Sequence, residues 1–531
     1  MAACLPQRAR AGPRLPGRWP RARATRSPTP VVLLASPASD ASPPRGVRVR
    51  DFVDAVERAE RDAYSDLNPG GACDLTRAES RLLEGKESAR GWALGGIERA
   101  APTTGAELKR ETARVLVDAG FGTPFAEGWL DPAWLTVLGA NAEAAAVEHV
   151  VEACVEAFEA EMDAGSTTPR IPGVIVLAPY RPAWPSPRTA ARRAFAAAAT
   201  DPGAFGGDVA KALDAAERFL RTSHDAETHR ETRVAAVVFG NPSPATGAVA
   251  SARTVADVYA WCEKRGAHAV ADETCALAAD AVVGDDDDFE SQDSNDRARR
   301  EVRDGIAWGR AAGFASATSL WPKAAHEKRH AVASFGAAGG ARRGNTTCFL
   351  ISRSSTTRAR VRGDPFAAQL QGLLADGGVA ARDAFGVHAA ALRERRRFAK
   401  ARLARANVAV GAPDDGGLHV WVDLRPFLSR SRDRNGDANG DSDEDTDANG
   451  DADGDTDANG DADEGWDAEA DLFDTLASAG GVTLVPGSLC GAGEPGFFRV
   501  AVAGEEATLR EGLRRLERWI REAGDERVGR G

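Results

Sequence analysis

The sequence lacks long hydrophobic runs and paired cysteines. No segment approaches the ~20 uninterrupted apolar residues that a membrane-spanning helix needs, which excludes an integral membrane protein. The seven cysteines include no Cys-x-x-Cys pair, which excludes a disulfide scaffold and a cysteine-rich zinc module. The chain has 531 residues, of which 43% are hydrophobic and 27% are charged. This composition predicts a globular protein, and the length predicts two folded domains with extra segments.

The negative charge is concentrated in one segment. The formal net charge is −12, but residues 433–464 alone hold 14 acidic residues and one arginine. The rest of the chain is therefore close to neutral. We expect no nucleic acid and no membrane among its partners, because the folded part has no basic surface signature.

Residues 1–45 have the composition of a transit peptide. They contain seven arginines before the first acidic residue, Asp40, and are otherwise rich in Pro, Ala, Ser and Gly. Such a segment predicts delivery to an organelle, with a plastid favoured over a mitochondrion. A disordered tail on a cytoplasmic protein is the alternative.

Two acidic segments have the character of insertions. Residues 284–296 and 433–465 are poor in large apolar residues, and the second contains the repeat TDANGDADGD followed by TDANGDADEG. This repeat resembles a calcium-binding loop, but position 12, which is Glu in an EF-hand, is Thr456 or Trp466. We therefore predict solvated low-complexity loops and no metal site, with a calcium-responsive segment as the alternative.

The body of the chain alternates short apolar runs with helical patterns. Strand-like runs and the helical stretches between them occupy residues 134–139, 142–162, 173–178, 208–222, 234–240, 254–265 and 267–271. Their alternation predicts an α/β fold with a mostly parallel, doubly wound sheet covered on both faces. After residue 417, GLHVWVDLR, VTLVPG, FFRVAVA and a final amphipathic helix predict a smaller α+β domain.

These patterns suggest a division into domains. We expect residues 50–110 to be an N-terminal segment of the small domain and residues 111–390 to form the large domain, which contains the first acidic insertion. Residues 391–525 then form the small C-terminal domain, which contains the second.

Three features lie where strands of the predicted sheet end, which is where ligands bind in open α/β folds. Gly139, Ala140 and Asn141 leave one strand and open a long helix, whose N-terminus can hold a phosphate. Asn241 begins the turn-rich NPSPATG after another strand. Asp272 ends a third apolar run, where its carboxylate could hold a protonated ring nitrogen or simply cap a helix.

In this order, with a lysine farther on and an arginine in a C-terminal strand, these features resemble the pyridoxal-phosphate (PLP) enzymes of the aminotransferase class I/II family. The resemblance spans about residues 60–522. It is strongest at 417–425 and 484–503, which are similar to 1-aminocyclopropane-1-carboxylate synthase and its aminotransferase-like relatives. It implies a fold-type-I architecture, PLP as cofactor, an amino acid and a keto acid as substrates, and a homodimer.

The resemblance also implies roles for individual residues. Asp272 would pair with the pyridinium nitrogen of PLP, and Arg499 would bind the substrate carboxylate through two parallel hydrogen bonds. The other positions implied to bind cofactor or substrate are Gly139, Ala140, Asn141 and Ser319 around the phosphate, Tyr180 over the ring, Asn241 near the cofactor, and Glu79 near the substrate.

The lysine that binds PLP should follow a strand in a Ser-x-Ser-Lys context. The segment TSLWPK at 318–323 offers this context with one residue inserted, which favours Lys323 as the covalent anchor and general base. Lys328 is the competitor. Phe335 and Gly336 resemble a turn that follows the lysine in the family, and an ungapped count back from this turn reaches His326, which lies within three residues of both lysines. Two surface lysines are the remaining alternative.

Several positions depart from the family pattern. Cys275 stands where a tyrosine should contact the phenolic oxygen of PLP, Pro244 where an asparagine should share that oxygen, and Ser334 where an arginine should bind the phosphate. Arg329 is a possible stand-in for that arginine. The stacking aromatic is expected as the second of two tyrosines, but Tyr180 is followed by Arg181, which leaves Tyr180 or Trp184 to cover the ring.

The sequence thus predicts PLP-dependent transamination of an amino acid, or a related reaction at Cα, in amino acid metabolism. Cyclopropane-forming elimination is a narrower option, ranked lower because the missing tyrosines belong to that active site. The rival is a degenerate family member that keeps the scaffold for binding or regulation without turnover.

Overall fold

The structure is a computed structural model of the whole chain. It describes residues 46–76, 105–122, 130–140, 143–163, 170–182, 184, 194–200, 208–228, 231–279, 316–321, 327–335, 346–361, 374, 379–410, 416–428 and 460–529.

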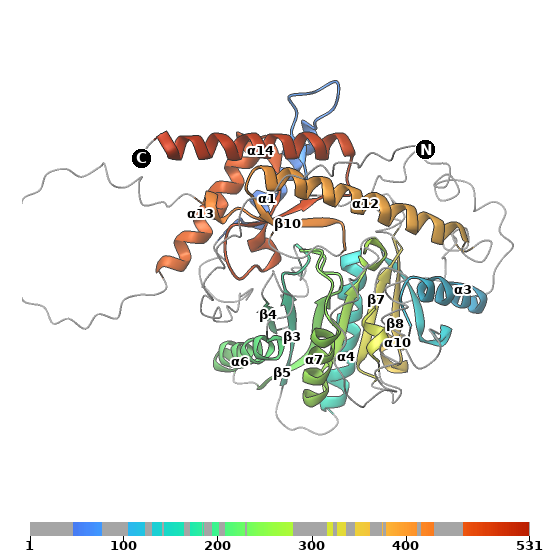
Figure 1. Cartoon of the computed structure of the whole chain (residues 1–531). Coiled ribbons are helices and arrows are strands. Elements are labelled where there is room, and N and C mark those ends of the chain that lie inside the picture. The colour runs from blue at the N-terminus through green and yellow to red at the C-terminus, as the bar shows by residue number, and fades with distance from the viewer. Residues whose placement is uncertain are drawn as a thin grey trace, which may run out of the picture.

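A seven-stranded mixed sheet forms the centre of the larger part, in the order β2-β8-β7-β6-β5-β3-β4 (Figure 1). Five of these strands, β7, β6, β5, β3 and β4, run parallel to one another. Strand β8 runs antiparallel to both of its neighbours, β2 and β7. The strands are β2 (Leu135–Ala140), β3 (Arg170–Ala178), β4 (Ala194–Ala199), β5 (Glu231–Gly240), β6 (His268–Glu273), β7 (Arg329–Ser334) and β8 (Thr346–Ser352). The predicted mostly parallel sheet is confirmed.

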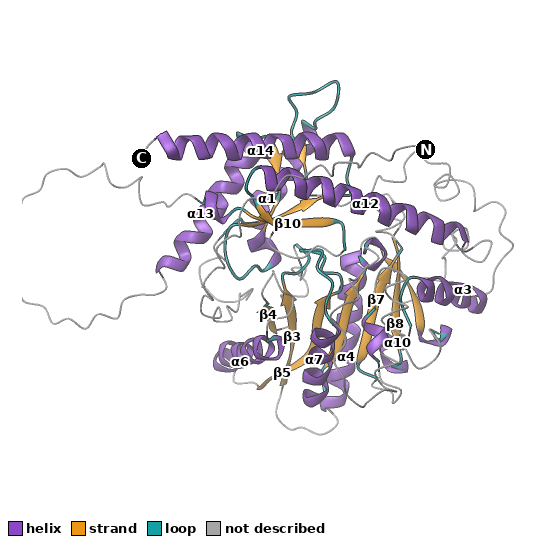
Figure 2. Ribbon diagram, viewed as in Figure 1, coloured by secondary structure: helices purple, strands orange, loops and turns teal. Residues whose placement is uncertain are grey.

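Helices cover both faces of this sheet, as the near-continuous apolar character of its strands requires (Figure 2). Alternate residues of one strand face opposite ways, so Ile175 packs against one layer of helices and Val176 against the other. One layer contains α3 (Gly105–Asp118), α6 (Val209–Thr228), α7 (Ala252–Arg265) and the 3-10 turn η5 (Ala317–Leu320). The other contains α4 (Glu143–Asp163) and α10 (Ser355–Arg360).

The smaller part is a four-stranded antiparallel sheet, β12-β13-β10-β9, covered by helices on one face. Its elements are α12 (Val379–Arg405), β9 (Ala409–Val410), β10 (His419–Asp423), η7 (Arg425–Phe427), α13 (Gly460–Ser478), β12 (Val485–Pro486), η9 (Gly487–Cys490), β13 (Phe497–Ala501) and α14 (Glu506–Gly529). The amphipathic pattern of the last helix is confirmed, since its apolar positions are buried in the core of this part. Helix α13 begins at Gly460, so the loop predicted to extend to residue 465 ends earlier than expected.

The N-terminal and C-terminal segments of the chain pack together. Helix α1 (Val49–Arg61) and strand β1 (Cys73–Asp74) share a core with α12, α13 and α14, and β1 pairs in parallel with β11 (Val482–Thr483). Figure 1 shows these blue elements among the orange and red ones. None of the described helices is long and apolar enough to cross a membrane.

Arg515 connects these two segments. Its buried guanidinium donates to the carbonyls of Pro69, Gly71 and Gly481, at 2.8, 2.7 and 3.2 Å, and its Nε donates to Glu511 at 2.8 Å. A lysine at this position would keep the charge but lose the planar fork that reaches several acceptors at once.

We expect Arg515→Lys to lower the free energy of unfolding by about 2–3 kcal/mol, because a charged donor loses several buried acceptors. Urea unfolding measures the change. Arg514→Lys is the matched control, since Arg514 binds the same Glu511 from an exposed position. Equal effects of the two substitutions would show that the buried contacts contribute nothing.

Candidate functional site

The candidate site lies where the carboxyl ends of β5 and β6 meet the small sheet. Asp272 is the penultimate residue of β6, and its carbonyl accepts from the backbone N–H of Asn241, which directly follows β5. Asp272 is 6% exposed. The prediction that the apolar run delivers this acid to the sheet edge is therefore consistent with its position.

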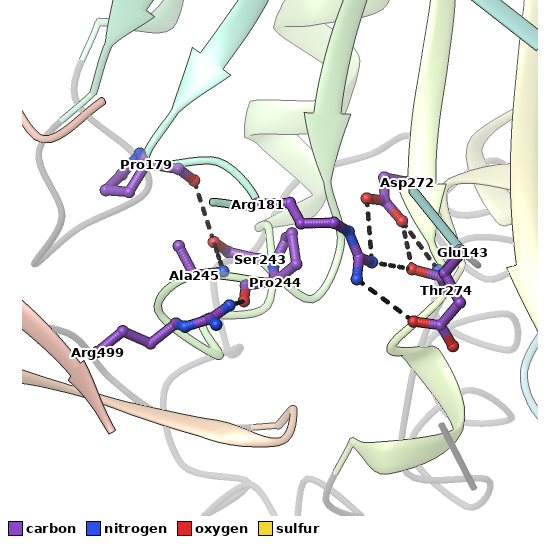
Figure 3. A network of polar contacts seen from close by, with 9 residues as sticks. All are labelled: Glu143, Pro179, Arg181, Ser243, Pro244, Ala245, Asp272, Thr274 and Arg499. Atoms are coloured by element: carbon purple, nitrogen blue, oxygen red, sulfur yellow. Dashed lines mark hydrogen bonds and ion pairs between the residues drawn. The ribbon is translucent and has the colours of Figure 1, made fainter. Parts of the chain in front are cut away.

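The guanidinium of Arg181 binds the Asp272 carboxylate (Figure 3). Arg181, just after β3, places Nη2 3.5 Å from Oδ2 of Asp272 and 2.5 Å from the hydroxyl of Thr274. Thr274 in turn donates from its hydroxyl and its backbone N–H to Oδ1 of Asp272, at 2.5 and 3.2 Å. Both carboxylate oxygens are thus occupied by protein donors.

Glu143 is the second anion bound to Arg181. Its Oε2 accepts from Nη1 of Arg181 at 3.3 Å, and Glu143 is the first residue of α4. Unpaired N–H groups at a helix N-terminus favour a negative charge there. Burial raises the pKa of Glu143, while Arg181 and the hydroxyl of Ser334 oppose that rise.

Arg181 stays charged between these two acids. Burial alone would lower its pKa, but Asp272 and Glu143 raise it above the ordinary value. The three side chains therefore form a carboxylate–guanidinium–carboxylate network at the end of the sheet, in which Asp272 is buried and Arg181 and Glu143 are partly exposed, at 20% and 15%. In Figure 3 the Arg181 guanidinium lies between the two acids.

Arg499 approaches the same region from β13, and among the described residues it has no acidic partner. It is 7% exposed, and it donates to the carbonyls of Pro244 at 3.2 Å and Thr76 at 3.1 Å. Its Nε has no hydrogen-bond partner, and no carboxylate of the described residues forms an ion pair with it. Burial lowers the pKa of Arg499 to about 10.

Other residues predicted at the site are engaged by protein neighbours. The Asn241 amide donates to Glu273 at 2.9 Å and accepts from the N–H of Ala250 at 3.0 Å, so it is fully used on the far side of β6. The Tyr180 ring packs against Gly491, where an added Cβ would lie 2.4 Å from a ring carbon. Trp184 packs edge-on against Phe195.

The phosphate positions are only partly described. Gly139 and Ala140 end β2, whereas Asn141 lies outside the described residues. Ser319 belongs to η5, which packs on the α7 side of the sheet, and its hydroxyl donates to the carbonyl of Ser316 at 2.6 Å. The structure does not bring Ser319 to α4. Glu79 also lies outside the described residues.

The strand expected before Lys323 is not there, because η5 is a 3-10 helix capped by Ser316, whose side chain accepts from Thr318. Lys323 itself lies outside the described residues. Lys328 is described, and its amine bonds to Glu161 at 2.6 Å and to the carbonyl of Gly266 at 2.8 Å. These contacts lie where β6 and β7 begin, at the opposite end of the sheet from Asp272.

Topology indicates which segment should carry a lysine that faces Asp272. β7 is the parallel neighbour of β6, and Asp272 pairs with Val332 near its end. The chain that leaves β7 therefore leaves at the Asp272 edge. Residues 336–345 read GAAGGARRGN and contain no lysine. Arg329, proposed as a phosphate-binding stand-in, begins β7 and lies over the Tyr259 ring, so it too is at the opposite end.

The family model described as aminotransferase class I and II matches residues 176–516. This chain belongs to the aminotransferase class I and II family. The comparison with curated proteins gives no match.

Solved structures show the same fold at low sequence identity. A double mutant of Thermus thermophilus aspartate aminotransferase has 17% identity and a TM-score of 0.54, covering 89% of this chain and 97% of its own. N-succinyldiaminopimelate aminotransferase from Mycobacterium tuberculosis has 18% identity and a TM-score of 0.52, covering 88% and 96%. Thermotoga maritima aspartate aminotransferase has 15% identity, the same TM-score and the same coverage. The fold-type-I architecture is thereby confirmed.

PLP, which this family typically uses, does not fit the described residues. The guanidinium of Arg181 lies on Asp272, where a cationic ring nitrogen would have to bind. The carboxylate of Glu143 stands at the N-terminus of α4, where the phosphate would have to bind, and two anions repel there. Cys275 and Pro244 supply no phenolic or amide donor for the ring oxygen.

Sequence reasoning did not assign a role to Glu143 or to the Arg181 side chain. Arg181 was visible as the residue that replaces an aromatic in the family pattern, and Glu143 as an acid at a predicted helix start. Two signals in the sequence could have identified the network. One is the basic residue that stands in place of an aromatic, and the other is the acid at the start of a helix expected to bind phosphate.

A second polar cluster lies at the other end of the sheet. Cys154, His268 and His330 have potential metal ligand atoms within 4.8 Å of one another, and all three are buried. The rings of His268 and His330 are already hydrogen-bonded at 2.9 Å, and His330 also bonds to Ser352 at 2.9 Å. Burial lowers the pKa of both histidines, so this is a neutral histidine pair in the core.

The Glu143–Arg181–Asp272 network yields a test by substitution. We expect Arg181→Met to lower the free energy of unfolding by about 2–4 kcal/mol at pH 8, because the buried Asp272 and the partly buried Glu143 lose their cation. The loss should shrink at pH 5, where the freed Glu143 carboxyl, whose pKa burial raises, takes up a proton more readily. Denaturant unfolding at both pH values measures it. Arg221→Met, which breaks an exposed ion pair with Glu217, is the control.

Glu273, next to Asp272, is buried and accepts from Asn241, Ser316 and Ala317. Burial raises its pKa to about 7 from the ordinary 4.5. The folded state then holds a proton that the unfolded state has released, so this group costs stability as the pH rises from 4.5 to 7.

Glu273→Gln keeps the shape and removes this titration. We therefore expect the variant to gain stability relative to the parent as the pH rises from 4.5 to 8, by about 2–3 kcal/mol. Chemical unfolding across this range gives the difference. Glu57→Gln on the exposed face of α1 controls for general charge effects, and a pH-independent difference for Glu273→Gln would contradict the prediction.

Proposed function

We propose that this chain binds a small carboxylate ligand on the aminotransferase scaffold and does not carry out PLP-dependent turnover. The observation that carries the proposal is the ion pair between Arg181 and Asp272. It provides, from within the chain, the cation that PLP would otherwise bring to Asp272. Glu143 likewise provides the anion at the start of α4.

Arg499 supports the binding part of the proposal. Within the described part of the chain, this buried guanidinium bonds to two neutral carbonyls and to no acid, so its charge is poorly compensated. An unpaired buried polar atom costs about 1–3 kcal/mol. A carboxylate that replaced those carbonyls would form charge-assisted hydrogen bonds, which are roughly twice as strong as neutral ones. The ligand class that best suits this position is therefore a small organic acid.

The second candidate is the PLP-dependent aminotransferase reaction on an amino acid and a keto acid. It is favoured by the retention of Asp272 at the sheet edge and of Arg499 near it, the two positions to which the family resemblance gives roles. It would need Lys323 as the covalent anchor. Asn141 at the phosphate and Glu79 at the substrate would complete that site.

Further expectations accompany both candidates as proposals. Within the family, we place the chain near the 1-aminocyclopropane-1-carboxylate synthase-like subgroup, on the segments at 417–425 and 484–503. We also propose a homodimer, and delivery to a plastid by residues 1–45, with a mitochondrial or cytoplasmic location as the alternatives.

The two candidates differ in their response to added PLP. We expect the full-length protein mixed with PLP to develop no saturable visible band. After borohydride reduction, peptide mass spectrometry should find only partial, non-saturable labelling of exposed lysines, identical in the parent and in Lys323→Arg. Stoichiometric labelling at residue 323, lost in Lys323→Arg, would overturn the proposal and establish the aminotransferase candidate.

A further inference from the structure

Three side chains that can bind a metal meet in the layer between α4 and the large sheet. Cys154 lies on α4, His268 begins β6, and His330 is the second residue of β7. Each residue has a potential ligand atom within 4.8 Å of those of the other two. All three residues are buried, with exposed fractions of 0%, 2% and 0%. They lie at the opposite end of the sheet from Asp272.

The strand register brings these groups to one face of the sheet. His330 pairs with Ser352 of β8 and with Val270 of β6, and His268 lies two residues before Val270. Alternate residues of a strand face the same way, and Val270 belongs to the core on the α4 side, as does Cys154. The ring of His268, and the ring of His330 bonded to it, therefore face the helix that carries the thiol.

Two imidazoles are unusual in such a core. Parallel strands covered on both faces are normally lined by aliphatic residues, and a buried polar group is costly unless it is hydrogen-bonded. The two rings supply each other with one bond, at 2.9 Å between Nδ1 of His268 and Nε2 of His330. The second ring nitrogen of His268, Nε2, is buried and has no hydrogen-bond partner in the described part of the chain. A histidine left incompletely bonded beside a thiol points to a ligand that binds there.

Both rings are already in the protonation state that a metal ion needs. Burial lowers the pKa of His268 to about 3 and that of His330 well below 6.5, so both are neutral at physiological pH. Ser352 bonds to Nδ1 of His330 at 2.9 Å and thereby orients this ring, as outer-shell partners of metal-bound histidines do. Burial raises the pKa of the Cys154 thiol, so this group alone must release a proton, which a coordinated metal brings about.

We propose that Cys154, His268 and His330 form a binding site for one soft transition-metal ion, copper(I) in preference to zinc. Thiolate and imidazole are ligands that both ions accept. A tetrahedral zinc ion separates its ligand atoms by about 3.3–3.6 Å, so the three atoms need to approach one another by no more than about 1.5 Å. The inference is independent of the proposed function, because the cluster shares no residue with the network around Arg181.

Charge is the reason for the preference between the two ions. One thiolate neutralises Cu⁺ completely, whereas Zn²⁺ bound by the same three side chains keeps a net charge of about +1, which is costly in a buried site. The positive charge of Lys328 already acts on His268 and lowers its pKa further, so it also opposes a charged complex. The neutral copper(I) complex avoids both costs.

Competition with chelators of known affinity tests the site on the reduced, full-length protein without air. Cu⁺ and Zn²⁺ are the two probes. We expect one Cu⁺ per chain, bound more tightly than Zn²⁺, and a higher midpoint of thermal unfolding when the ion is present. Because the thiol releases one proton on binding, the apparent affinity should rise about tenfold per pH unit between pH 6 and 8.

Substitutions assign the binding to these side chains. Cys154→Ala and His268→Gln should each weaken it by more than about a hundredfold, and Ser352→Ala, which removes only the outer-shell bond, by about tenfold. Cys348→Ala removes another buried thiol of the same core and is the matched control, which should keep the full affinity. Circular dichroism confirms folding, and His268→Gln serves if Cys154→Ala does not fold.

The site is overturned if neither ion binds, if the affinity does not depend on pH, or if binding survives both Cys154→Ala and His268→Gln. Zn²⁺ held by the acidic segment at 433–465 would give this last result. Tighter binding of Zn²⁺ than of Cu⁺, lost in both variants, would overturn the preference for copper(I). None of these results bears on the proposed carboxylate ligand, which depends on Arg499.

Discussion

The ion pair between Arg181 and Asp272 determines what this site can hold. Asp272 is buried at the end of β6, and a buried carboxylate needs a cation nearby to remain charged. In this chain the cation comes from the protein itself, and Arg181 is held in turn by Glu143 and Thr274. A positively charged ring could bind Asp272 only by displacing a guanidinium that has three protein partners.

The two arginines of the site have opposite environments. Arg181 is compensated by two acids, which raise its pKa, whereas Arg499 is buried against neutral carbonyls, which leave its pKa lowered by burial. On the proposed function, the first arginine takes the place of the cofactor's cation and the second receives an anion. The combination is consistent with a scaffold that has kept ligand recognition while losing the cofactor chemistry.

The sequence predicted four of the seven strands of the large sheet, β2, β3, β5 and β6, because these are apolar runs bounded by Gly, Pro, Asn or Asp. It did not predict β4, β7 and β8. It also placed Asp272, since an acid that ends such a run must emerge at the sheet edge. It failed at residues 317–320, where the hydroxyl of Ser316 binds the backbone and favours a 3-10 turn over the strand expected from the Ser-x-Ser pattern. The partner of Arg181 could not be read from the sequence either, because the pair joins residues 91 positions apart.

The most direct test of this account is a crystal structure of the protein grown in the presence of excess PLP. The account predicts that Arg181 remains within ion-pair distance of Asp272 and that no pyridine ring lies against this carboxylate. A ring nitrogen bonded to Asp272, with Arg181 displaced and a lysine joined to the ring, would contradict it.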